Sequence, residues 1–175
     1  MQRRHASLVR SYSRLASGHE RPDDRYRVYT LDVRGHGHSG RAVRDAIADY
    51  VTDAEAMLAV IGAPTRVGHS LGGVVAGVLA QSDSALVHAA LMLDPAWYFG
   101  VPEEFAGTVY PQPTRLIRCD STLGAAFPDN HAERIHGVKR CTDIVHYAGS
   151  DHFPQRTFAF AKRFRGDLER FLRDE

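Results

Sequence analysis

One pentapeptide, Gly68-His69-Ser70-Leu71-Gly72, combines a hydroxyl group with a glycine spacing suited to nucleophilic chemistry. It lies between a short strand candidate, residues 65–67, and a run rich in small residues, 71–81, which indicates a strand that turns abruptly into a helix. Such a turn strains its central residue, and the two flanking glycines relieve the crowding. The turn would expose the Ser70 hydroxyl and aim the Leu71 amide at a developing oxyanion. The alternative interpretation is a tight turn in which the serine is incidental.

A serine needs a base to lose its proton at neutral pH, and histidine is the usual one. Among ten histidines, His152 is distinguished by its position in the loop 148–154, after the last strand candidate. The carboxyl ends of parallel strands share one rim of the sheet, so this loop and Ser70 are expected to meet there. His69 is expected to face elsewhere and to pack locally. The alternative interpretation of His152 is a solvated loop histidine.

A carboxylate should orient His152 and stabilise its cation, and two aspartates end strand candidates on the same rim. Asp120 follows the segment TRLIRC, and Asp94 follows LVHAALML. We favour Asp120, because the strand it ends should neighbour the strand that leads to His152, and we keep Asp94 as the alternative acid.

The composition is that of an ordinary globular domain. The chain has 175 residues, 43% hydrophobic and 25% charged, with a net charge of +1. These values exclude a disordered chain, a collagen-like repeat and a disulfide-stapled miniprotein. They also give no support to a nucleic-acid partner or to an acidic membrane as a partner.

No apolar run resembles a signal peptide or approaches the length of a membrane span, so a cytoplasmic location is expected. The two cysteines, Cys119 and Cys141, fit a reducing compartment. They are expected at opposite ends of neighbouring strands, which disfavours a disulfide between them.

Strands and helices alternate along the chain, which predicts an α/β fold with a mostly parallel sheet of about five strands flanked by helices. The strand candidates are residues 27–33, 65–67, 86–93, 114–119 and 143–147. The helix candidates are residues 41–61, 71–81, 130–136 and 158–172, the first with a possible restart at a capping box formed by Thr52 and Glu55. Residues 1–25 are poorly specified: we expect a short helix over 7–16 or a loosely attached segment.

Several runs in this order, RVYTLDVRGHGHSG, GHSLGG, LMLDPAW, PTRLIRCD and AGSDHFP, resemble the α/β-hydrolase fold family over residues 26–172. The resemblance implies a cofactor-free serine hydrolase that acts on an ester, thioester, lactone or related acyl bond. It makes Ser70 the nucleophile, His152 the base and Asp120 the acid, in the family's chain order. It also makes Asp32 part of a structural turn. His36 and His38 in that turn lack a third ligand at suitable spacing, so we expect no metal.

The resemblance is incomplete at the N-terminus. Family members carry strands before the one at residues 27–33, and a loop after one of them supplies the second oxyanion amide. Nothing in residues 1–25 resembles that strand and loop, so the fold is expected to be truncated, with residues 26–175 as the catalytic core and no separate cap domain. The strands at 27–33 and 65–67 would then pair directly, leave a gap, or borrow a strand from another chain. Arg66 lies in a buried strand and must reach a carboxylate or water.

The expected substrate is a small ester or acyl compound. The segment 95–113 is short for a lid, which predicts an open site, and the apolar pocket is expected to include His69, Trp97, Tyr98 and Phe153. The same apolar residues would also suit a homo-oligomer contact through an exposed sheet edge. Two functions therefore stay open: an active esterase-like hydrolase, and a degenerate relative that acts as a remnant or an interaction protein.

Overall fold

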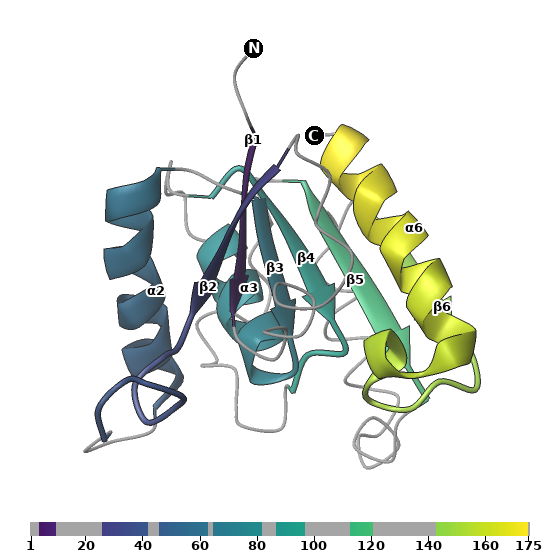
Figure 1. Ribbon diagram of the computed structural model, residues 1–175, viewed down its shortest axis with the longest axis horizontal. Helices are drawn as coiled ribbons and strands as arrows, with labels where there is room; N and C mark the ends of the chain where they lie inside the picture. The colour runs from purple at the N-terminus through teal and green to yellow at the C-terminus, as the bar shows by residue number, and fades with distance from the viewer. Residues whose placement is uncertain are drawn as a thin grey trace.

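The computed structural model of the protein describes residues 4–9, 26–41, 46–62, 65–81, 87–96, 113–120 and 143–174. The strands in these ranges form one parallel sheet of six, in the order β2-β1-β3-β4-β5-β6 (Figure 1). They are β1 (Arg4–Val9), β2 (Tyr26–Leu31), β3 (Thr65–His69), β4 (Ala89–Leu93), β5 (Thr114–Cys119) and β6 (Asp143–Tyr147). The predicted α/β class and parallel sheet are confirmed, with one strand more than expected.

The additional strand is β1, which occupies the position where a strand was expected to be missing. Its backbone pairs with β2 from Arg4 opposite Tyr26 to Val9 opposite Leu31, and with β3 on its other side. The strands at 27–33 and 65–67 therefore neither pair directly nor leave a gap. The expected helix over 7–16 is wrong at residues 7–9, and its remainder lies outside the described residues. The local sequence pattern does not indicate this strand. It forms because β2 and β3 pair with it on its two sides.

The helices are α2 (Ile47–Ile61), α3 (Leu71–Gln81) and α6 (Phe158–Asp174), with a short 3₁₀ helix η3 (Pro154–Arg156) before α6. The prediction of α3 is confirmed at both ends. The expected restart within α2 is wrong: the helix is continuous, and the Thr52 hydroxyl donates to the carbonyl of Ala48 one turn earlier. The expected helix at 130–136 lies outside the described residues.

Helices cover both faces of the sheet, as a parallel sheet requires. On one face, Ala90 and Met92 of β4 pack with Ala76 and Ala80 of α3. The alternate residues of β4 pack on the other face with two phenylalanines of α6, Phe164 and Phe171. The small residues of α3 therefore let that helix lie close to β4, the strand that Asp94 follows. On the other face of the sheet, α6 packs on β4 with bulky side chains.

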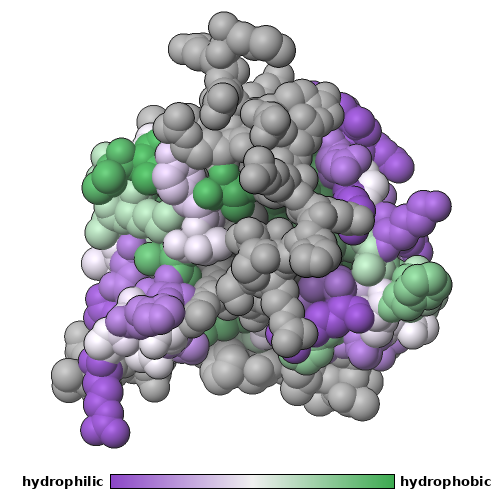
Figure 2. Space-filling view, viewed as in Figure 1, coloured by the Kyte–Doolittle hydropathy of each residue, from purple (hydrophilic) through white to green (hydrophobic). Residues whose placement is uncertain are grey.

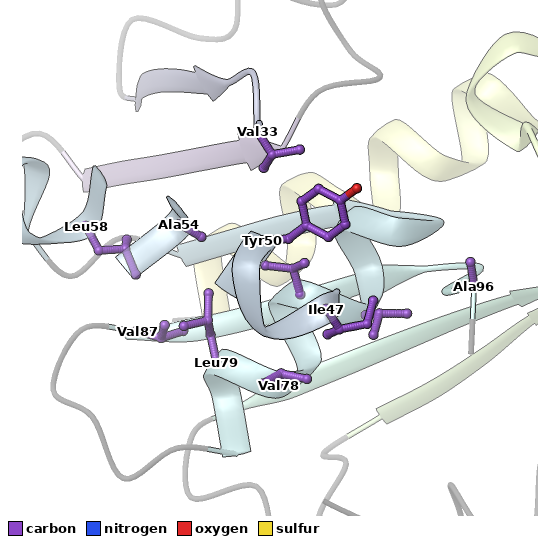
Figure 3. Packing of buried hydrophobic residues seen from close by; sticks show 11 residues of the cluster. Val33, Ile47, Tyr50, Ala54, Leu58, Val78, Leu79, Val87 and Ala96 are labelled. Atoms are coloured by element: carbon purple, nitrogen blue, oxygen red, sulfur yellow. The ribbon is translucent and has the colours of Figure 1, made fainter. Parts of the chain in front are cut away.

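A second layer of packing joins α2 to α3. Buried side chains of α2, among them Tyr50 and Leu58, share one cluster with Val78 and Leu79 of α3 (Figure 3). This cluster anchors α2 on the outside of α3. Hydrophilic residues dominate the side of the molecule where α6 lies, whereas hydrophobic residues gather at the end of α2 that carries Val60, which is 85% exposed (Figure 2). Of the helices that the structure describes, none combines the length and apolar character needed to cross a membrane.

The turn after β2 is held by its own polar groups. Asp32 accepts hydrogen bonds from the backbone N–H of His38 (2.9 Å) and from Nδ1 of the same residue (3.3 Å), while Nδ1 of His36 donates to the carbonyl of Arg34. The Arg34 guanidinium binds Asp53 of α2 at 2.7 Å. Both histidines are thus engaged within a structural turn, the role predicted for this segment.

Candidate active site

The segment that joins β3 to α3 has the strained geometry predicted for a nucleophile-bearing turn. Ser70 adopts a φ of 54°, in the left-handed region that non-glycine residues rarely occupy. A Cβ atom on Gly68 would lie 1.9 Å from the carbonyl oxygen of Gly72, so only glycine fits at that position. The predicted steric requirement for glycine is therefore confirmed at Gly68, the first of the two flanking glycines.

The start of α3 presents backbone donors beside Ser70. The N–H groups of Gly73 and Val74 donate to the Ser70 carbonyl at 2.9 and 3.2 Å, which closes the first turn of the helix. The Leu71 amide is the first of α3 and has no acceptor within its own helix. It therefore belongs to the positive end of the helix dipole, the place predicted for an oxyanion donor.

Backbone hydrogen bonds connect Ser70 to the residues on both sides of Asp94. The Ser70 N–H donates to the carbonyl of Leu93, and the N–H of Ala96 donates to the carbonyl of Ser70, each at 3.0 Å. Asp94 itself has a φ of 39°, so the chain turns sharply at the end of β4. The serine and this aspartate are thus held in one rigid backbone unit.

The carboxylate of Asp94 binds His152. The Nδ1 atom of His152 lies 2.6 Å from Oδ2 of Asp94, and both side chains are buried. The other carboxylate oxygen accepts the backbone N–H of Cys119 at 3.0 Å, which fixes the orientation of the carboxylate. Because a carboxylate oxygen is an acceptor, Nδ1 carries the proton, and Nε2 of the neutral ring is left as a proton acceptor.

Asp120, the acid favoured from the sequence, does not contact His152. It binds a different histidine: Oδ1 lies 2.6 Å from Nε2 of His146, and Oδ2 accepts the N–H of Gly149 at 2.8 Å. The Gly149 amide and then His146 lower the pKa of the Asp120 carboxyl. The assignment of Asp120 as the partner of His152 is therefore corrected, and Asp94 takes that place.

The path of the loop after β6 explains the exchange of the two aspartates. β5 and β6 are neighbours, as expected, but His152 follows the end of β6 by five residues. Asp120 holds the start of this loop at Gly149, and the loop then returns across the rim to the end of β4. Adjacency of β5 and β6 thus brings Asp120 to the beginning of the loop, and the return of the loop brings its histidine to Asp94 at the end of β4.

His69 is buried against His152. Its Nε2 atom lies 2.6 Å from the carbonyl oxygen of His152, and the two ring centroids are 4.5 Å apart. Burial, opposed by this hydrogen bond, lowers the pKa of His69 to about 4. His69 was expected to face elsewhere and to contribute to the substrate pocket; its ring, only 4% exposed, is instead packed onto the rings of His152 and Phe153.

Within the part of the chain that the structure describes, the Ser70 hydroxyl makes no hydrogen bond to the His152 ring. Catalytic hydrogen bonds are often long in a free enzyme and tighten once substrate is bound. The two residues are connected through His69, which precedes Ser70 directly and donates to the His152 carbonyl. The described site therefore brings together Ser70, His152 and Asp94 through their immediate neighbours.

Of the two predicted pocket residues within the described ranges, His69 and Phe153, only Phe153 combines exposure with contact to His152. Its ring is 36% exposed, lies 4.9 Å from the His152 ring and carries the Arg156 guanidinium at 4.7 Å. Trp97 and Tyr98 lie outside the described residues, as does most of the predicted lid.

Two other buried groups lie close to the site in the sheet. Burial raises the pKa of the Cys119 thiol to about 12, which leaves it protonated and unreactive at neutral pH. Arg66, in the centre of β3, is fully buried, and burial lowers its pKa to about 10, so it stays charged near neutral pH. Cys119 is a free thiol as expected, and Cys141 lies outside the described residues.

The family model described as alpha/beta hydrolase fold matches residues 9–142. Among solved structures, a monoacylglycerol lipase from Paleococcus ferrophilus superposes with a TM-score of 0.75 at 15% identity, covering 98% of this chain and 95% of the lipase. An esterase from Pyrococcus furiosus superposes with a TM-score of 0.72 at 16% identity, covering 98% of this chain and 83% of the esterase. A mutant meta-cleavage product hydrolase superposes with a TM-score of 0.77 at 13% identity, covering 98% of this chain and 92% of the hydrolase.

A comparison with curated proteins finds no match. The family model covers well over half of the chain, and the parallel sheet flanked by helices agrees with it. This chain belongs to the α/β-hydrolase fold family.

Proposed function

We propose that the protein is a cofactor-free serine hydrolase that cleaves an ester or related acyl bond through an acyl-enzyme. Ser70 is the nucleophile, His152 the general base and Asp94 the acid that orients it. The observation that carries the proposal is the 2.6 Å contact between His152 Nδ1 and Asp94 Oδ2, made beside the strained turn that bears Ser70. A buried histidine oriented by a carboxylate next to an accessible serine is the arrangement that activates a hydroxyl.

The chemical steps follow from the proton positions. Ser70 Oγ attacks the acyl carbon while its proton moves to Nε2 of His152, and the negative charge that forms on the carbonyl oxygen faces the Leu71 amide. The tetrahedral species collapses as the bond to the leaving oxygen breaks, and His152 returns the proton to that oxygen. Water then repeats the sequence on the acyl-enzyme, which releases the acid and restores Ser70. Asp94 stabilises the imidazolium at both stages.

The substrate class rests on two observations. The matched structures include a lipase and an esterase, which supports an acyl bond as the point of cleavage. The partly exposed Phe153 ring beside His152 would pack against an apolar or aromatic substituent. We therefore propose a small ester with an apolar group as the substrate.

A fluorophosphonate probe tests the proposal, because it phosphonylates only an activated serine. We expect the folded protein to acquire one adduct, which peptide mapping places on Ser70, and to hydrolyse p-nitrophenyl butyrate. The S70A variant should lose the adduct and at least about a thousandfold of the hydrolysis rate. The matched control, S39A, changes an exposed serine in the turn after β2 and should keep both.

The opposite result is equally clear. A parent protein with a cooperative unfolding transition but no adduct at Ser70 would contradict the proposal. The chain would then be a degenerate relative that retains the fold without the activity.

A further inference from the structure

His69 has two contacts with the candidate base, and each acts on a different part of it. Its Nε2 atom lies 2.6 Å from the His152 carbonyl oxygen; since that oxygen is only an acceptor, His69 Nε2–H donates. Its ring also packs on the His152 ring, with centroids 4.5 Å apart and planes inclined by 40°. One side chain thus restrains both the backbone and the imidazole of His152.

We propose that His69 is a positioning residue that sets the distance between the nucleophile and the base; this rests on the proposed function. His69 and Ser70 are consecutive, so the hydrogen bond from the His69 side chain connects the residue next to the nucleophile to the backbone of the base, 83 positions after His69 in the chain. Asp94 orients the His152 ring about its Nδ1 side, and His69 limits movement of the whole residue toward or away from Ser70.

The charge state of His69 suits this role. When His152 takes the serine proton it becomes a cation, and a second cation 4.5 Å away would oppose that step. Burial lowers the pKa of His69 to about 4; the hydrogen bond to the His152 carbonyl and the Asp94 carboxylate oppose this shift, while charge on His152 and Arg156 adds to it. His69 is therefore neutral near pH 7, and it restrains His152 without competing with it for charge.

Two substitutions separate the hydrogen bond from the packing of the ring. H69F keeps a ring of similar size but removes the donor. H69Q loses the ring but places a terminal amide N–H₂ close to the position of Nε2. H69N is the matched control, because its shorter amide reaches only the position of Nδ1.

The experiment measures kcat and KM with p-nitrophenyl butyrate, the rate of fluorophosphonate labelling at Ser70, and thermal unfolding of each variant. Misplacement of reacting groups by about 1 Å costs on the order of a hundredfold in rate. We expect H69F to lower kcat and the labelling rate by about ten- to a hundredfold, with KM within about twofold of the parent. In H69Q, kcat and the labelling rate should both lie within about threefold of the parent values.

Contrary outcomes are distinct from one another. H69F with parental rates, or H69Q no faster than H69F, would contradict the positioning role. If H69F fails to fold, H69Q and H69N decide the question: a faster H69Q supports the proposal, and equal rates contradict it. An unlabelled parent would instead contradict the proposed function, whereas a labelled parent with unaffected variants contradicts only the role of His69.

Discussion

At the scale of single residues, Asp94 connects the two halves of the candidate site. One carboxylate oxygen binds His152 and the other binds the backbone of Cys119, while Leu93 and Ala96, before and after Asp94, are hydrogen-bonded to Ser70. A carboxylate held at both oxygens keeps its orientation when the histidine beside it gains a proton. This arrangement fits the stabilisation of an imidazolium.

Ser70 and His152 could be predicted from the sequence because each has a local signal: a glycine-spaced turn, and a loop directly after a strand. The choice between Asp94 and Asp120 had no such signal, since both aspartates end strands on the same rim. Only the return of the loop 148–152 toward β4 distinguishes them, and this path is a tertiary feature that no local pattern indicates.

His69 should make the stability of the protein depend on pH. Its pKa is about 6.5 when unfolded and about 4 when folded, so between these values the unfolded chain binds the proton and the folded protein does not. Stability is then fully present above pH 6.5 and falls as the pH decreases toward 4. Between pH 7 and pH 4, we expect the free energy of unfolding, measured with urea, to fall by about 3 kcal/mol more in the parent than in H69Q. Parallel curves for the two proteins would contradict this assignment.

At the scale of elements, the turn from β3 into α3 depends on the absence of a side chain at Gly68. Because a Cβ there would meet the backbone of Gly72 at 1.9 Å, G68A must displace the start of α3. We expect a loss of about 3 kcal/mol in the free energy of unfolding, together with most of the labelling at Ser70.

The matched control for G68A is G166A, at a position of α6 where an added Cβ meets nothing within 4 Å. Because alanine has a higher helix propensity than glycine, the free energy of unfolding of this variant should rise by roughly 0.5–1 kcal/mol, and Ser70 labelling should stay at the parental rate. Equal effects of the two substitutions, measured by chemical denaturation, would show that the close approach at Gly68 does not constrain the turn.

A buried hydrogen bond attaches α6 to the end of β6. The Tyr147 hydroxyl donates to Asp167 at 2.7 Å in a buried contact, and burial raises the pKa of that tyrosine. Y147F should lower the free energy of unfolding by about 1–3 kcal/mol, because the Asp167 carboxylate loses the buried hydroxyl that donates to it. D174N, at the end of the same helix, provides the control and should change the melting temperature little. A melting temperature unchanged in Y147F would argue against this contact as an anchor.

Elements with a clear pattern could be predicted closely, as α3 and β5 show. Phe160, Phe164, Leu168 and Phe171 recur at helical spacing in the sequence, and they form the face of α6 that packs on the sheet. By contrast, β1 has no comparable signal of its own. It exists as a strand because β2 and β3 offer hydrogen-bonding partners on both sides, and that information is not local.

At the scale of the whole molecule, β1 makes the sheet continuous from β2 to β6. Its loss would separate β2 from the strands that carry the site. We expect a variant lacking residues 1–9 to show no cooperative unfolding transition by circular dichroism, whereas removal of residues 1–3 alone should preserve it. A cooperative transition and Ser70 labelling in the longer deletion would contradict the central place of β1.

The rate of fluorophosphonate labelling in D94N and D120N decides whether Asp94 or Asp120 serves His152 and Ser70. Both substitutions are isosteric and both aspartates bind a histidine at 2.6 Å, so each variant controls for the other. We predict that D94N slows labelling by about 10³–10⁴-fold while D120N stays within about threefold of the parent. A D120N variant that loses labelling while D94N keeps it would show instead that Asp120 is the acid of the site.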